Sequence, residues 1–146
     1  MNHSDLDSIE PTQAEREISE DGNATYLDVR TVAEFAKGRP KGRAVNVPLE
    51  FYHPSTQDTH PNEAFILVLE TIFDRAHPII IGADSASPRA ENSAVILNER
   101  GFTNLSILKN GVDAWAQKQL AVTKDNREGV SYVSLLTRAR RTAAKK

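Results

Sequence analysis

The sequence contains no cysteine among its 146 residues. A thiolate is the usual sulfur nucleophile and a common metal ligand, so this absence excludes disulfides, thiolate metal sites and thiol redox chemistry. No apolar run approaches the roughly 20 residues that a membrane-spanning helix needs, and we expect no membrane contact. Residues 1–7 are polar and acidic, unlike a signal peptide. These absences predict a cytoplasmic protein.

Histidine is also scarce, and the four histidines lie at positions 3, 53, 60 and 77 without the spacing of a metal site. We therefore expect neither a metal nor any other cofactor. The composition is otherwise ordinary, with 39% hydrophobic and 26% charged residues. That composition and this length suit one globular domain with a single core.

The charge is unevenly distributed along the chain. Residues 124–146 hold seven basic and two acidic residues, a net charge of +5, whereas the rest holds 11 basic and 18 acidic residues, a net charge of −7. Such a tail docks on its own acidic body, on a partner or on nucleic acid, or is simply solvated. The arginines at 138, 140 and 141 have no aromatic residues between them, so nucleic-acid binding is not expected.

The tail also contains a short amphipathic pattern. Tyr132, Leu135, Leu136 and Ala139 recur at helical spacing before the basic end. The first three of these side chains suit packing against a second copy of the chain, which would form a homodimer. We thus divide the chain into a flexible lead (1–10), a folded domain (11–123) and a basic, partly helical tail (124–146).

Helix and strand signals alternate through the domain. Pro11 suits the first turn of a helix, Thr31 and Glu34 form a capping-box pattern, and the apolar run Ile79–Ile81 is typical of a strand covered on both faces. The polar segment 49–62 reads as an irregular loop, and Trp115 as a core residue. The predicted helices are 11–18, 32–37, 62–76, 89–100 and 112–118, and the predicted strands 25–30, 44–48, 79–81 and 104–108. This order predicts an α/β three-layer sandwich, with a mostly parallel sheet of about five strands flanked by helices.

Several short motifs, in order and with consistent spacing, resemble the rhodanese-like (sulfurtransferase) domain family. Arg39 stands where that family usually has histidine, Arg43 is inserted before Ala44, and Asn110 replaces a glycine. The segments that carry the resemblance are Tyr26-Leu27-Asp28-Val29-Arg30 with Glu34-Phe35, Gly38-Arg39-Pro40-Lys41-Gly42-Arg43-Ala44-Val45-Asn46-Val47-Pro48, Ile79-Ile80-Ile81-Gly82, Gly101-Phe102, and Leu108-Lys109-Asn110-Gly111-Val112-Asp113-Ala114-Trp115.

The resemblance implies an active-site loop after the strand 79–81. In the family, a CxxGxR loop presents backbone N–H groups and an arginine to a cysteine persulfide and an anionic substrate. Alignment from Gly101 places Asp84 at the cysteine position, and alignment from Ile79 places Ala83 there. We favour Asp84, which needs no insertion. The loop and candidate anion-binding residues are then Asp84, Ser85, Ala86, Ser87, Pro88 and Arg89.

An aspartate cannot carry a persulfide, so no catalytic residue is assigned. The carboxylate would also neutralise the loop, through Arg89 or the loop amides, and Pro88 removes one amide donor. The favoured hypothesis is a non-catalytic binding or regulatory module without thiosulfate sulfurtransferase activity, whose partner is an unidentified protein or a small anion. The alternatives are a carboxylate-dependent hydrolase or phosphatase-like enzyme that uses Asp84, and a degenerate domain whose loop has no remaining role.

Asp28 and Arg30 form a second candidate feature. They lie near the end of a predicted strand, where buried charges need partners. We expect them to support the neighbouring loop through structural hydrogen bonds rather than to act in chemistry.

Overall fold

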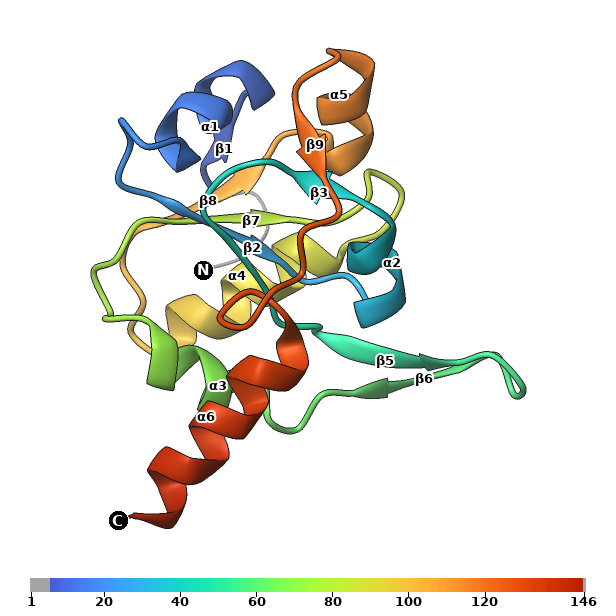
Figure 1. Ribbon diagram of the computed structural model, residues 1–146, viewed down its shortest axis with the longest axis vertical. Coiled ribbons are helices and arrows are strands. Elements are labelled where there is room, and N and C mark those ends of the chain that lie inside the picture. The colour runs from blue at the N-terminus through green and yellow to red at the C-terminus, as the bar shows by residue number, and fades with distance from the viewer. Residues whose placement is uncertain (1–5, 146) are drawn as a thin grey trace.

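The computed structural model describes residues 6–145 and shows an α/β fold built on a parallel sheet (Figure 1). The sheet has five strands in the order β1-β8-β7-β2-β4, and every neighbouring pair is parallel. Its strands are β1 (Ser8–Ile9), β2 (Thr25–Asp28), β4 (Ala44–Asn46), β7 (Ile79–Gly82) and β8 (Leu105–Leu108). The helices are α1 (Pro11–Ile18), α2 (Val32–Lys37), α3 (Phe65–Ile72), α4 (Arg89–Glu99), α5 (Gly111–Gln117) and α6 (Tyr132–Ala144).

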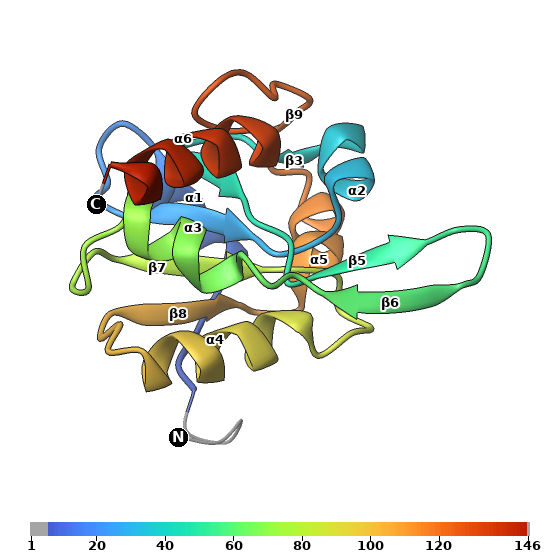
Figure 2. The ribbon, with the colours of Figure 1, turned by 90° about the horizontal axis from the view of Figure 1, so that it is seen from below.

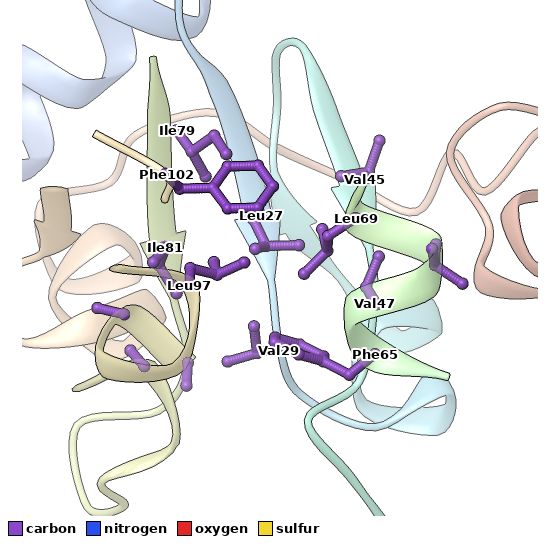
Figure 3. Close-up of a cluster of buried hydrophobic side chains, with 14 of the residues drawn as sticks. Leu27, Val29, Val45, Val47, Phe65, Leu69, Ile79, Ile81, Leu97 and Phe102 are labelled. Atoms are coloured by element: carbon purple, nitrogen blue, oxygen red, sulfur yellow. The ribbon is translucent and has the colours of Figure 1, made fainter. Parts of the chain in front are cut away.

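One face of the sheet packs against α3, α4 and α6. Alternate residues of β2 and β7 point to this face, and they meet Leu69 of α3 and Leu97 of α4 in a continuous cluster (Figure 3). Leu27, Ile81, Leu69 and Leu97 are all completely buried, with exposed fractions of 0%. This cluster is the larger part of the hydrophobic core.

The opposite face packs against α1 and α5. The intervening residues of the same strands, Tyr26 and Ile80, point here and contact Ile18 of α1 and Trp115 of α5. Trp115 is buried, as the sequence predicted, and its indole Nε1 donates to the Ala121 carbonyl (2.9 Å). The run of three isoleucines in β7 is therefore apolar because both faces of the sheet are covered, which confirms the predicted three-layer sandwich.

Two helices begin where local signals placed them. Pro11 occupies the first turn of α1. At α2 the Thr31 hydroxyl accepts from the Glu34 N–H (3.2 Å), and Glu34 Oε1 accepts from the Thr31 N–H (3.1 Å), so the capping box is complete. At α2 the first unpaired N–H groups thus find side-chain acceptors, whereas α1 has no side-chain cap and begins at a proline whose fixed φ suits the first turn.

The prediction of an irregular loop over residues 49–62 is wrong. This segment forms a β-hairpin of β5 (Glu50–His53) and β6 (Asp58–Pro61), which projects from the body of the protein (Figures 1 and 2). Most of its side chains are exposed, so it lacks the alternation of apolar and polar residues that identifies a half-buried strand. Gln57 adopts a left-handed φ of 59° in the turn. The ring centroids of Phe51 and Tyr132 are 6.1 Å apart, so the hairpin contacts α6.

Short pairings also form at both ends of the predicted domain. Ser8 and Ile9, assigned to the flexible lead, form edge strand β1 beside β8. Residues 1–5 of that lead, and Lys146 of the tail, lie outside the described residues. Arg39–Pro40 (β3), which lies outside the predicted strands, pairs antiparallel with Val122–Thr123 (β9). Two-residue strands have too little sequence to show a period, which explains why they were missed.

The C-terminal helix α6 packs on α3 and belongs to the core. Tyr132, Leu135 and Ala139 are buried, with exposed fractions of 5%, 2% and 0%. The Tyr132 hydroxyl donates to Asn62 Oδ1 (3.1 Å). Two of the three side chains that the sequence suggested for self-association are therefore covered by the protein's own chain, because α3 offers them an apolar face.

Candidate functional site

The candidate loop joins β7 to α4 at the carboxyl edge of the sheet. In parallel sheets the crevice at this edge is where ligands usually bind. Ala83 is 1% exposed and belongs to the core, whereas the side chain of Asp84 is 31% exposed. Asp28, at the end of neighbouring β2, pairs in register with Gly82, so the two candidate features lie side by side.

Arg89 is the centre of the hydrogen bonding in this loop. Its Nη1 and Nη2 donate to Glu34 Oε1 (2.7 Å) and Oε2 (3.0 Å), a bidentate pair between α4 and α2. Nη2 also donates to Asp84 Oδ1 (2.7 Å), and Nε donates to Ser87 Oγ (3.1 Å). All three guanidinium nitrogens are thus engaged by the protein, and the Arg89 side chain is only 13% exposed.

The ionisation of the two carboxylates follows from this geometry. Hydrogen bonds from Arg89 lower the pKa of Glu34 to about 2, against the opposing effect of burial. Burial would raise the pKa of Asp84, but hydrogen bonds from Arg89 and Ser87 outweigh it and hold the pKa below its ordinary value. Glu34 and Asp84 are therefore both anionic at neutral pH, and together they raise the pKa of Arg89.

A third carboxylate occupies the other side of the loop. Asp113, in the first turn of α5, accepts from both the N–H (3.2 Å) and the hydroxyl (2.5 Å) of Ser85. The approach depends on Gly111, which has a φ of +66°. A Cβ placed on Gly111 would lie 2.2 Å from the Ala83 carbonyl oxygen. The Val112 N–H donates to that oxygen (2.9 Å), which ties α5 to the loop.

Asp28 and Arg30 form a buried ion pair behind the loop. Arg30 Nε donates to Asp28 Oδ1 (2.9 Å) and Nη2 donates to Oδ2 (2.8 Å). Arg30 is 8% exposed and Asp28 is 0% exposed. The Tyr26 hydroxyl also donates to Asp28 Oδ2 (2.9 Å), and Arg30 Nη2 reaches the Gly38 carbonyl (2.9 Å). The pair thus joins the end of β2 to the residue that follows α2.

The charges around the loop are the reverse of an anion cradle. Glu34 and Asp84 both accept from the Arg89 guanidinium, and on the other side of the loop the Ser85 amide is already bonded to Asp113. Pro88, the N-cap of α4, supplies no N–H. An incoming sulfur-oxy or phosphate-like anion would meet the charge of these carboxylates and an arginine that already donates to two of them.

Sequence reasoning and structure overlap in part at this loop. The Asp84–Arg89 contact was foreseen as a way for the loop to neutralise itself. The sequence does not predict the contacts of Glu34 and Asp113 with the loop, because it identifies Glu34 as a helix cap and motif residue and Asp113 as a motif residue. Their loop partners lie 55 and 28 residues away in the sequence. Among residues 6–145 there is no group of three or more His, Cys, Asp or Glu side chains placed to hold a metal ion.

The fold is that of a rhodanese-like domain. That family matches residues 10–118, and the protein belongs to it. It is 31% identical to the rhodanese-like domain-containing protein 17 of Arabidopsis thaliana over 122 residues, covering 83% of this chain and 75% of that one. It is 33% identical to the chloroplastic thiosulfate sulfurtransferase 16 of the same plant over 95 residues, covering 65% and 76% of the two chains.

Solved structures give the same fold. The Alr3790 protein from Anabaena sp. superposes with a TM-score of 0.63 at 16% identity, over 94% of each chain. A polysulfide-sulfur transferase homodimer from Wolinella succinogenes gives 0.61 at 20% identity, over 83% of this chain and 80% of that one. Two of the plant relatives are named chloroplastic, so the cytoplasmic location stays a prediction. No helix within residues 6–145 is long and apolar enough to cross a membrane.

Proposed function

We propose that this protein is a non-catalytic rhodanese-like module that acts by binding or regulation and has no thiosulfate sulfurtransferase activity. The observation that carries the proposal is the chemistry at the nucleophile position. The chain has no cysteine, and Asp84 stands in the loop as a carboxylate bonded to Arg89. A carboxylate offers no sulfur to form or hold a persulfide.

The loop lacks a sulfur nucleophile, and its main charged donor is also bonded to the protein's own carboxylates. Four of the five N–H donors of Arg89 are used by Glu34, Asp84 and Ser87, and the Ser85 amide is bonded to Asp113. For a small anion to bind, it would have to displace at least one of these carboxylates and overcome the charge of the others. We therefore place the loop's role in holding α2, α4 and α5 together, and the binding function on other surfaces.

The carboxylate-enzyme alternative receives no support from the geometry. A general base works best with a pKa near the working pH. Oδ1 of Asp84 accepts from both Arg89 (2.7 Å) and Ser87 (2.6 Å), and its pKa is lowered. A panel of phosphate and carboxylate esters tests this alternative: turnover lost in Asp84→Asn would revive it.

The direct test of the proposal is a sulfur-transfer assay on the purified natural protein. Thiosulfate and 3-mercaptopyruvate serve as donors, cyanide as acceptor, and an authentic thiosulfate sulfurtransferase as the positive control. We expect no thiocyanate above the protein-free rate. Thiocyanate that scales with protein concentration and is lost in Arg89→Ala prepared the same way would overturn the proposal. Activity unchanged in Arg89→Ala would identify a contaminant and leave the expectation met.

A further inference from the structure

A separate pocket of about 820 Å³ lies at the other end of the sheet from the loop. It reaches Thr25, the first residue of β2, whereas Asp84 follows the last residue of the parallel strand β7. Its walls come from the end of α1, the edge strand β4, the end of α3, the segment between β9 and α6, and α6 itself. None of its lining residues belongs to the loop 83–88.

The inner wall of this pocket is apolar. It is formed by side chains that also complete the core or its margin: Ile18, Val45, Ile72, Phe73 and Leu135. A volume of this size lies within the range of about 300–1,000 Å³ typical of sites for small organic molecules. The pocket is therefore large enough and apolar enough to hold an alkyl chain or an aromatic ring.

The rim of the pocket is basic. Five basic residues, the buried Arg39 among them, and three acidic residues line the pocket. One of the acids, Asp125, is paired with Arg127, and within the described chain the Lys41 and Arg138 side chains form no ion pair. The Arg43 guanidinium donates to the backbone carbonyls of residues 19, 22 and 24, with no carboxylate among its partners. A net positive rim favours an anionic group at the mouth.

Arg39 adds a buried positive charge to the wall. It is only 4% exposed, and its hydrogen bonds go to the backbone carbonyls of Pro40, Gly42 and Asp125 rather than to a carboxylate. Burial lowers its pKa, as expected for a charge that its surroundings stabilise incompletely. These four bonds use four of the five N–H donors of a guanidinium.

Both arginines that depart from the rhodanese-like motif line this pocket. Arg39 stands at the position where histidine is usual, and Arg43 is the inserted residue. We propose that the pocket binds a small organic anion with an apolar body, an alkyl or aryl carboxylate or sulfonate. Its anionic group meets Lys41 and Arg138 at the rim, and Arg39 and Arg43 add positive charge to the wall. The site is independent of the active-site loop, so its fate does not depend on the proposed function.

Two fluorescent probes with the same apolar body test the site. The anionic probe is 8-anilinonaphthalene-1-sulfonate, and the neutral one is N-phenyl-1-naphthylamine, which lacks the sulfonate. On the full chain at low salt we expect one molecule of the anionic probe to bind, about tenfold tighter than the neutral probe. Decanoate below its micellar concentration is expected to displace it. Equal affinities, or no displacement, would overturn the proposal.

Charge variants locate the binding. Lys41→Glu and Arg138→Glu are each expected to weaken the anionic probe about fivefold and the neutral probe hardly at all. Arg141→Glu, on the same helix but outside the pocket, is the matched control and should bind like the natural protein. Equal loss of affinity for the anionic probe in all three variants would show that the probe responds to the overall surface charge, and would refute the site. Co-sedimentation with phosphatidylglycerol vesicles that survives excess decanoate would assign the basic surface to lipid and refute it too.

Discussion

The Glu34–Arg89 ion pair gives the sharpest prediction about the loop, and Glu34→Gln is the change that isolates it. Glutamine keeps an oxygen that can accept from Thr31 in the capping box, but it removes the charge and one acceptor of the bidentate pair with Arg89. Loss of stability in this variant therefore reports the ion pair rather than the helix cap.

The size of the effect follows from the pKa of Glu34, which falls from its ordinary value of 4.5 to about 2. Each pKa unit corresponds to about 1.4 kcal/mol, so the full shift corresponds to about 3 kcal/mol. The Glu34 side chain is 38% exposed, and solvent screening reduces this figure. We expect Glu34→Gln to lower the free energy of unfolding by about 1–2 kcal/mol at pH 7.

The pH dependence has a defined sign. Because the pKa of Glu34 is lower in the folded than in the unfolded protein, its stabilisation is fully present above about pH 4.5 and is lost as the pH falls through about 2. Urea unfolding between pH 7 and pH 2 measures this for the natural protein, Glu34→Gln and the control Glu128→Gln, an exposed glutamate. The difference between natural protein and Glu34→Gln should shrink across that window. A difference that is constant with pH, or equal in the control, would refute the reasoning.

Two further variants test the parts that hold the loop. Asp28→Asn leaves Arg30 buried without its counter-charge and should destabilise the protein by about 3–5 kcal/mol in urea unfolding, whereas Asp74→Asn on the surface should change stability by less than about 0.5 kcal/mol. Gly111→Ala forces a Cβ to within 2.2 Å of the Ala83 carbonyl and should speed hydrogen exchange at the Val112 amide. Gly129 also has a positive φ, of +87°, but a Cβ placed there has no neighbouring atom within 4 Å, so Gly129→Ala should leave exchange at the Val112 amide unchanged.

The parts of the fold that sequence predicted are those specified by neighbouring residues. Pro11 and the Thr31–Glu34 capping box place their helices because caps act within one turn. Successive residues of a strand point to opposite faces of the sheet, so the three consecutive isoleucines of β7 by themselves indicate a strand covered on both faces. The hairpin β5–β6 escaped prediction because its exposed strands are held by pairing with each other and not by burial of one face.

The candidate site divides along the same line. Asp84 and Arg89 are five residues apart, and their contact was foreseen from the sequence. Glu34 and Asp113 come from α2 and α5, and only the folded sheet brings them to the loop. Arg39 and Arg43 were noted as departures from a motif, but their pocket is completed by α6, which is distant in sequence.

The central claim is that the protein's own carboxylates close the loop. Thermal unfolding with and without thiosulfate, sulfite, sulfate and phosphate, at constant ionic strength, tests it most directly. We expect no anion-dependent rise in Tm, either for the natural protein or for Arg89→Ala. A rise that saturates with anion concentration in the natural protein and disappears in Arg89→Ala would show a working anion cradle and contradict the account.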